Sequence, residues 1–400
     1  MKANHDGRGK RLKILHVCLA SSYTEGMTYQ DNMLADQNVE DGHEVVVVSD
    51  CTCYEKGRIV PTEPEDRILA NGIRLVRLPY DRIFTRFVSD KIRKTKRLRP
   101  LIDQFAPDVI LFHGCAGYEL ITAAKYKKAH PHVKLYADSH EDFTNSARNW
   151  LSKNILHRII YRFFFQRAKN QIDKVLCTSP LRLQFVKQIY NAPLELLEVF
   201  RMGGTILSES EREEIRDDLR KAHGVTDNQI LLLHAGKLDK LKKTVELLQT
   251  FQKISDLTFR LIIAGAISEE IESEFYAMLK EDNRIQYIGW LSGFELDRLY
   301  CAADVYLQPG RHSVNVENAV CKGCAMIVSP SSNQMQTVSH ENGWEIGDIE
   351  EIQTILKEIL SDRTILMEKK ENSLSYAKKN LDYVKLAKRY TTGYESEQEK

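Results

Sequence analysis

Short runs of consecutive apolar residues recur along the chain, separated by polar loops and by segments with helical periodicity. A continuous run of this kind is typical of a strand that is buried on both faces of a parallel sheet. In the first half, the runs predict strands at 12–20, 43–50, 73–80, 107–114, 133–140 and 173–180. Helical patterns separate the later strands. This alternation predicts right-handed βαβ units and a doubly wound α/β sheet.

The pattern resets after Leu194, where a strand-like segment runs into a glycine turn and the charged, helix-forming segment 206–224 follows. A second series then predicts strands at 229–236, 259–266, 285–291, 303–310 and 325–330, followed by helices to about Tyr394. We therefore expect two doubly wound, Rossmann-like domains that face a central cleft. The predicted parts are a disordered basic tail at 1–11, an N-terminal domain at 12–204, a C-terminal domain at 205–378, and a segment at 379–400 in which a helix packs back on the N-terminal domain and a tail follows.

Composition adds limits to this picture. Charged residues make up 28% of the 400 residues and the net charge is +1, which argues against a dedicated nucleic-acid binder. No apolar run approaches the length of a membrane span, and the polar start lacks the apolar core of a signal peptide. Eight scattered cysteines suit reduced thiols, and the CxxC of Cys321 and Cys324 lacks a second pair at zinc-site spacing. These features indicate a cytoplasmic protein.

The clearest candidate for chemistry is the loop that follows the strand at 229–236. The strand ends at Gly236, Lys237 follows at once, and three more lysines precede an amphipathic segment. Free N–H groups at a helix start attract anions, and Lys237 and Lys243 would add full charges suited to a diphosphate. The alternative is an ordinary βα turn with solvated lysines.

Other candidates also follow predicted strands, where ligands of parallel sheets bind. In the first half, Gly26 lies in the loop after the first strand, His113 ends the fourth strand and His140 ends the fifth. A glycine lets backbone approach a ligand, and a histidine at a strand end can orient a sugar hydroxyl or a phosphate oxygen. Each of these residues has a structural alternative: a turn glycine, or a histidine that packs in the core.

In the second half, a polar loop follows the strand at 303–310. Here Ser313 would cap a helix that begins near Val314 and would present N–H groups to an anion. Glu317 or Asn318 would accept hydrogen bonds from ribose hydroxyls, although the helix dipole alone also stabilises a carboxylate there. The remaining candidates on these loops are Gly236, Gly265, Arg311 and His312. No Asp-x-Asp occurs, so we expect lysines and helix ends, and no metal, to neutralise the anion.

The chain resembles a GT-B glycosyltransferase of the large retaining group often called family 4, over roughly residues 12–390. GKLDKLKKTVELL resembles the family's G-R-x…K-G-x-x-x-L element, whose two cations bind the donor diphosphate. Lys237 then stands for the arginine and Lys243 for the second cation, with Lys242 as a one-residue-shift alternative. HGC at 113–115 sits where the family often has a histidine near the reacting sugar, and Gly26 lies at its glycine-loop position.

The sequence departs from the family at the paired-glutamate motif, E-x7-E. Anchoring on Gly323 places Asn318 at the second glutamate and Gly310 at the first, while Glu317 comes one residue early. The carboxylate that contacts the donor sugar is therefore missing from its usual place. This departure leaves the donor sugar open.

The resemblance implies transfer from a nucleotide-diphosphate sugar to a cell-surface glycan or a lipid-linked acceptor, with retention and without a metal. It also implies that the N-terminal domain at 12–204 lies on the acceptor side and that the C-terminal domain at 205–378 binds the nucleotide sugar. The leaving phosphate would help to deprotonate the acceptor hydroxyl, and Lys237, Lys243 and the helix start at Ser313 would stabilise the diphosphate. His113 would orient the donor sugar, and His140 would lie on the acceptor side. Two alternatives remain open: a GT-B-like nucleotide-sugar epimerase and a non-catalytic binding subunit.

Two basic segments carry interleaved aromatic residues. Residues 82–99 contain eight Lys and Arg against one acid, and residues 148–171 are similar. Both suit a helix that docks on anionic lipid. For 148–171 we favour a solvated basic face over the domain core. For 82–99 we expect contact with an anionic membrane, which would place the protein on the inner face of the cytoplasmic membrane.

Overall fold

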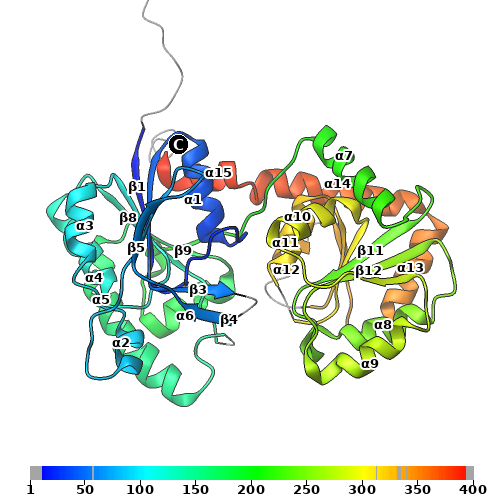
Figure 1. Cartoon of the computed structure of the whole chain (residues 1–400), viewed down its shortest axis with the longest axis horizontal. Helices are drawn as coiled ribbons and strands as arrows, with labels where there is room; N and C mark the ends of the chain where they lie inside the picture. Colours follow the sequence, from blue (N-terminus) through cyan, green and yellow to red (C-terminus); the bar gives the residue numbers. More distant parts are fainter. Residues whose placement is uncertain are drawn as a thin grey trace, which may run out of the picture. The chain divides into compact units, whose positions relative to one another are not determined.

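The computed structural model describes residues 11–55, 58–143, 145–311, 313–330, 335–338 and 341–392. The predicted tail at 1–11 therefore lies outside the described residues except for Arg11. The chain forms two compact units (Figure 1). One unit holds the chain up to Glu25, Tyr29–Arg201 and the chain from Val384, and the other holds Gly26–Thr28 and Met202–Tyr383.

The first unit is built on an eight-stranded sheet. Its order is β10-β9-β8-β7-β1-β2-β6-β5, and all neighbours pair in parallel except β5 with β6. The strands are β1 Lys13–Cys18, β2 Glu44–Ser49, β5 Glu65–Ile68, β6 Arg74–Arg77, β7 Val109–Phe112, β8 Lys134–Ser139, β9 Lys174–Cys177 and β10 Leu197–Val199. The apolar runs mark strands buried on both faces: Val46 and Val48 of β2 pack into one core cluster, and Val45 and Val47 into another.

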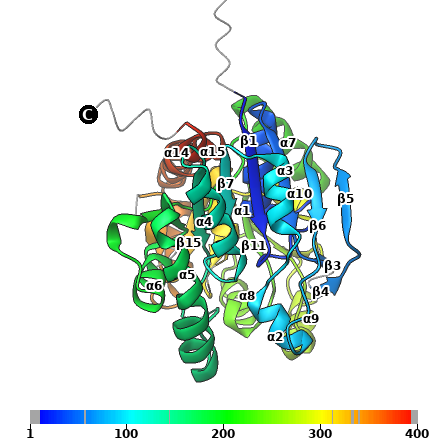
Figure 2. The same cartoon turned by 90° about the vertical axis from the view of Figure 1, so that its left-hand side faces the viewer.

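Helices cover this sheet, and α3 and α4 lie side by side (Figure 2). The helices are α1 Gln30–Glu40, α2 Arg86–Ile92, α3 Leu98–Phe105, α4 Glu119–Ala129, α5 Arg162–Ala168, α6 Pro180–Tyr190 and α15 Tyr383–Thr391, with a π-helix at Ser152–Tyr161 directly before α5. Local sequence fixes their ends. At α6, for example, the Ser179 hydroxyl accepts a hydrogen bond from the Arg182 N–H, and Pro180 occupies the first turn.

Three features of this unit differ from the sequence prediction. The short strands β3 Thr52–Glu55 and β4 Arg58–Pro61 form an antiparallel hairpin, and β5 follows it, where no strand was predicted. The basic segment 82–99 is not one helix, because Arg93 adopts a left-handed backbone (φ 56°) and ends α2. The terminal helix starts later than predicted: α14 ends at Asn380 and α15 begins at Tyr383, while residues 393–400 lie outside the described part of the chain.

The second unit is built on a fully parallel six-stranded sheet of order β13-β12-β11-β14-β15-β16. The strands are β11 Ile230–Ala235, β12 Phe259–Ala264, β13 Ile285–Tyr287, β14 Val305–Gln308, β15 Ala325–Val328 and β16 Gly343–Glu345. The helices are α7 Glu209–Ala222, α8 Thr244–Gln252, α9 Glu269–Leu279, α10 Gly293–Ala302, α11 Asn315–Cys321, α12 Met335–Val338, α13 Glu351–Ser361 and α14 Arg363–Asn380. Alternate residues of β11 enter opposite cores: Leu232 packs into one cluster and Leu231 and Leu233 into the other.

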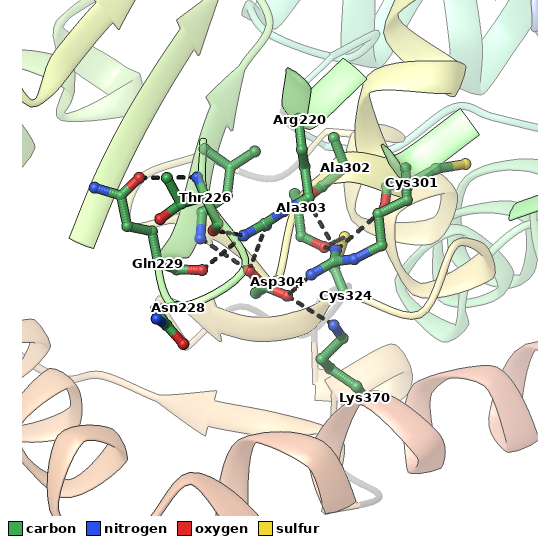
Figure 3. A network of polar contacts seen from close by, with 12 residues as sticks. Arg220, Thr226, Asn228, Gln229, Cys301, Ala302, Ala303, Asp304, Cys324 and Lys370 are labelled. Atoms are coloured by element: carbon green, nitrogen blue, oxygen red, sulfur yellow. Dashed lines mark hydrogen bonds and ion pairs between the residues drawn. The ribbon is translucent and has the colours of Figure 1, made fainter. Parts of the chain in front are cut away.

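A buried ion network holds the amino end of β14 (Figure 3). The carboxylate of Asp304, directly before β14, accepts hydrogen bonds from Arg216 of α7 (2.6 Å), Arg220 of α7 (3.0 Å) and Lys370 of α14 (2.7 Å). It also accepts one from the N–H of Leu231 in the neighbouring strand (2.9 Å). One carboxylate thus ties two helices and two strands together.

None of the helices among the described residues is long and apolar enough to cross a membrane.

Candidate functional site

The loop after β11 lies directly beside the end of β12. Gly236 and Gly265 both have a positive φ, 125° and 142°, which favours glycine. A Cβ atom on Gly265 would lie 1.8 Å from the carbonyl oxygen of Gly236, so only glycine permits this approach. The hydroxyl of Tyr287 donates to the carbonyl of Gly265 (2.8 Å) and fixes the turn from β13. Two of the predicted glycines are therefore brought together at the carboxyl edge of the sheet.

The lysines that follow Gly236 point in different directions. A short 3-10 turn at Lys240–Lys242 is capped by Asp239, whose carboxylate accepts from the Lys242 N–H (3.0 Å). This turn buries the side chain of Lys242, and its Nζ donates to Oε1 of Gln308 (3.0 Å). Nζ also lies 3.4 Å from the position that a Cβ atom on Gly236 would take. Lys237 and Lys243, the two predicted cations, are exposed.

Lys243 occupies the residue between the 3-10 turn and α8. Its backbone is left-handed (φ 56°), a conformation in which glycine is the common residue, and its side chain makes no capping hydrogen bond. Lys243, the predicted second cation, is exposed. The buried Lys242, which is the one-residue-shift alternative, is the lysine whose Nζ lies beside Gly236.

Positive charge dominates the electrostatics of this loop. Burial, together with the nearby charge of Arg311, lowers the pKa of Lys242 to about 7, and Asp239 opposes this shift. Within the described parts of the chain, no carboxylate lies within 4.0 Å of the Lys242 ammonium. The guanidinium of Arg311 is 56% exposed and lies 3.9 Å from the Asp239 carboxylate. A buried cation with an amide as its partner is suited to an incoming anion.

The loop after β14 is joined to this lysine turn. The N–H of Arg311 donates to the carbonyl of Leu241 (2.8 Å), and a Cβ atom on Gly310 would lie 2.2 Å from that same carbonyl oxygen. Gln308 holds the turn from inside: its Oε1 accepts from Lys242 and from the hydroxyl of Tyr306 (3.0 Å), and its Nε2 donates to the carbonyl of Arg311. Sequence reasoning missed Gln308 and Tyr306, because nothing in a buried strand pattern marks a polar side chain as functional.

The helix that follows starts within one residue of the predicted position, at Asn315 with Val314 before it. The Ser313 hydroxyl accepts from the Asn315 N–H (3.3 Å), so it satisfies one free N–H at the helix start. The Asn315 amide reaches back to the carbonyl of Ala235 (3.1 Å). The predicted His312 lies outside the described residues.

The two predicted ribose-contacting residues are both buried on α11. Glu317 is 6% exposed and Asn318 is 7% exposed. A Cβ atom on Gly204 would lie 3.2 Å from the side-chain oxygen of Asn318, so this amide packs against the start of the second unit. Asn318 is therefore engaged inside the unit.

In the first unit, His113 lies inside a buried polar chain. Its Nδ1 pairs with the carboxylate of Asp138 (2.6 Å) and its Nε2 with Nδ1 of His16 (3.0 Å). His16 continues to Oδ1 of Asn38 (3.0 Å), which also accepts from the hydroxyl of Tyr390 (2.9 Å). Both ring nitrogens of His113 are thus occupied by protein partners, contrary to a direct contact with donor sugar in this state.

Within this row of hydrogen-bonded side chains, the charged groups are His113 and Asp138. Burial opposes the charged forms, but Asp138 raises the pKa of His113, and His113 holds the pKa of Asp138 below its usual range. Burial lowers the pKa of His16 to about 3, which keeps that ring neutral. His140 is the exposed member: its side chain is 41% exposed, and its Nε2 lies 3.6 Å from the Asp138 carboxylate. Gly26 has a positive φ of 72°, and among the described residues no atom beyond its chain neighbours lies within 4 Å of the position that a Cβ atom would take.

Among the described residues, no group of three or more His, Cys, Asp or Glu side chains is placed to hold a metal ion. The eight cysteines carry free thiols, and Cys321 and Cys324 are buried.

Two family models match the chain. The model for glycosyl transferases group 1 matches residues 215–380, and the model for Glycosyltransferase Family 4 matches residues 32–203. The first match lies within the second unit, and the second match covers most of the first unit and ends just beyond it. Together the two matches span most of the described chain. No curated protein sequence matches it.

Several solved structures share the fold at low sequence identity. Sucrose-phosphate synthase from Thermosynechococcus elongatus has a TM-score of 0.67 at 13% identity, over 97% of this chain and 99% of that one. HepE from Anabaena, solved in complex with UDP, has a TM-score of 0.65 at 15% identity, over 96% and 100%. WaaG, a glycosyltransferase involved in lipopolysaccharide biosynthesis, has a TM-score of 0.62 at 14% identity, over 94% and 99%. The chain belongs to the GT-B glycosyltransferases, and its second unit is a domain of the glycosyl transferases group 1.

Proposed function

We propose that this glycosyltransferase uses a nucleotide-diphosphate sugar and binds the donor diphosphate at the turn between β11 and α8. The observation that carries the proposal is the buried ammonium of Lys242 beside Gly236, with an amide oxygen and no carboxylate as its close partner among the described residues. A diphosphate oxygen would supply the missing negative charge. HepE, which shares the fold, has been solved with UDP and with UDP-glucose, and this adds support.

In this proposal, three cations share the charge of the leaving group. Lys242 binds the diphosphate from inside the turn, and the exposed Lys237 and Arg311 approach it from the solvent side. Arg311 is held in place by two backbone contacts, from its N–H to Leu241 and from its carbonyl to Gln308. Preorganised charges of this kind stabilise a leaving diphosphate without a divalent metal.

We propose that transfer of the hexosyl group retains the configuration at the anomeric carbon. The bond from this carbon to the diphosphate oxygen breaks, and the acceptor oxygen bonds to the same face. The acceptor proton passes to an oxygen of the leaving phosphate, so no protein nucleophile is needed. His113 would act as a positioning residue: with Asp138, which also accepts from the Gly114 N–H (2.7 Å), it fixes the turn after β7.

We further propose that the protein works at an anionic membrane and on a glycan or lipid-linked acceptor. Phe84 is 89% exposed and Phe87 is 71% exposed, and both lie within the basic segment 82–99. Exposed aromatic rings among cations suit the interface of an anionic bilayer.

A thermal-shift screen tests the donor proposal. UDP, GDP and ADP are titrated against the protein and against the matched variants Lys242→Met and Lys243→Met, which keep the apolar stem. We expect one nucleotide to raise the melting temperature of the wild type and of Lys243→Met, and to raise that of Lys242→Met much less. Equal shifts in the two variants would refute the assignment of Lys242. If the protein converts the matching nucleotide sugar into an isomer in the absence of an acceptor, the result would favour an epimerase.

A further inference from the structure

The first unit contains a cavity of about 630 Å³. It lies beyond the carboxyl ends of β1, β2 and β6, where ligands of open parallel sheets bind, and its volume is typical of a small-molecule site. Its lining includes Leu19, Asp50, Tyr80, Arg82, Arg86 and Arg93. None of these residues takes part in the proposed donor site.

One wall of the cavity is a fixed polar surface. The hydroxyl of Tyr80 donates to the carbonyl of Leu19 and lies 3.3 Å from the carboxylate of Asp50. Asp50 is 8% exposed and also accepts from the hydroxyl of Thr52 (2.9 Å). Burial raises the pKa of Asp50, so its carboxyl group gains from hydrogen-bond donors, and the hydroxyl groups of a polyol are such donors.

The cavity lining also includes three arginines, from α2 and its flanking residues. Within the described parts of the chain, no carboxylate lies within 4.0 Å of the guanidinium groups of Arg82, Arg86 or Arg93, although Asp50 and Asp90 also line the cavity. Arg93 donates one hydrogen bond, to the carbonyl of Ala116 (3.4 Å). These side chains therefore retain donors for a ligand.

A fourth arginine nearby shows what a structural arginine looks like in this unit. Arg77 of β6 is buried and donates to the carbonyls of Asp50, Thr52 and Tyr23 and to the carboxylate of Glu65. Its N–H groups therefore form hydrogen bonds within the unit itself. The contrast indicates that the arginines of the cavity serve another purpose.

We propose that this cavity binds a phosphorylated polyol or sugar, whose phosphate is held by Arg82, Arg86 and Arg93 and whose hydroxyl groups face Asp50. Guanidinium groups bind phosphate oxygens in pairs, and three of them match a group that carries up to two negative charges. The proposal rests on the glycosyltransferase function above, in which this ligand is the acceptor. The phosphate group belongs either to a soluble sugar phosphate or to a lipid headgroup.

Binding measurements on the full chain test the proposal. The two probes are glucose 6-phosphate and phosphatidylcholine vesicles that contain phosphatidylinositol. The test variant is Arg82→Gln with Arg86→Gln, since both side chains are exposed and their loss leaves the core intact. The control is Arg97→Gln, which removes one positive charge from an exposed position of the same basic segment outside the cavity lining.

We expect the wild type to bind one of the two probes, and the double variant to bind it about tenfold more weakly or worse, with Arg97→Gln close to wild type. Binding of the sugar phosphate alone identifies a soluble acceptor, and binding of the vesicles alone a lipid headgroup. The proposal is overturned if the wild type binds neither probe, or if Arg97→Gln and the double variant lose affinity equally. UDP is titrated against the wild type in parallel. If the wild type does not bind UDP, the donor proposal is refuted. If it binds UDP but neither probe, the proposal of a phosphate-binding cavity is refuted.

Discussion

The two ends of strand β14 place buried charge in opposite ways. At the amino end, the carboxylate of Asp304 is matched by the cations of Arg216, Arg220 and Lys370. At the carboxyl end, four residues further on, Gln308 faces the buried ammonium of Lys242 through an amide oxygen. The first cluster is a closed ion network. In the second, no carboxylate of the described residues lies within 4.0 Å of the ammonium.

This difference separates structural from functional charge within a single sheet. A buried charge is costly unless it is paired, so the network at Asp304 serves to join α7 and α14 to the sheet. The same physics makes the site at Lys242 unfavourable when empty and favourable once an anion binds. The predictions below test this contrast from both ends of the strand.

The largest effect is expected at the closed network. Asp304→Ala leaves three cations without their common partner, and loss of one member of a buried pair typically costs about 3–5 kcal/mol of the free energy of unfolding. Urea denaturation measures this change. Asp217→Ala, at an exposed position of α7, is the control and should stay within about 0.5 kcal/mol of the wild type. A similar loss in both variants would show that the network has no special role.

The pH dependence of stability sharpens this end of the comparison. Burial opposes ionisation of Asp304, but Lys370 and Arg216 hold its pKa below the usual range. A carboxyl group with a depressed folded-state pKa contributes stability above its unfolded pKa of about 3.9, and this contribution is lost as the pH falls further. We therefore expect Asp304→Asn to lose less stability than the wild type between about pH 4 and pH 2. Parallel curves would contradict the predicted ionisation of Asp304.

At the open end, the expected effect is on binding. Lys242→Met should weaken the affinity for the nucleotide by about 10- to 100-fold, as is usual for the loss of a charged hydrogen bond. Isothermal titration calorimetry with the nucleotide found in the thermal-shift screen measures it. Lys243→Met should bind as the wild type does. A larger loss in Lys243→Met would restore the register predicted from the sequence.

The smallest effect concerns the backbone of Lys243. Its left-handed conformation costs a side-chain-bearing residue about 1 kcal/mol relative to glycine. Lys243→Gly should therefore leave the free energy of unfolding unchanged or raise it by up to about 1 kcal/mol, and leave nucleotide affinity unchanged. A clear loss of stability in urea denaturation would show that the Lys243 side chain stabilises the turn.

The central strands of both sheets could be predicted from the sequence, because a strand that is buried on two faces must be apolar throughout. The edge strands β5 and β16 could not, because β5 is polar and largely exposed and β16 has only 3 residues. Gly236 and Gly265 could be predicted as well, since a glycine after a buried strand marks a tight approach. The hairpin at 52–61 escaped prediction because its strands are short, polar and largely exposed. Such strands carry neither alternation nor a continuous apolar run.

The side-chain geometry of the site was harder to predict. Whether Lys242 or Lys243 points inward depends on one left-handed residue, and lysine gives no signal for that backbone. The partners of His113 come from β1 and β8, far apart in the sequence, so its occupied ring nitrogens are visible only in three dimensions.

One measurement tests the role of Lys242 most directly: the number of protons taken up when UDP binds at pH 8.5. It is obtained by titration calorimetry in buffers of different ionisation enthalpy. With a pKa of about 7, Lys242 is mostly neutral at this pH before binding, and a bound diphosphate raises that pKa. We predict uptake of close to one proton by the wild type and by Lys243→Met, and of none by Lys242→Met. Binding of UDP without proton uptake by the wild type, or with equal uptake by Lys242→Met, would contradict the role of Lys242 as the buried counter-ion of the diphosphate.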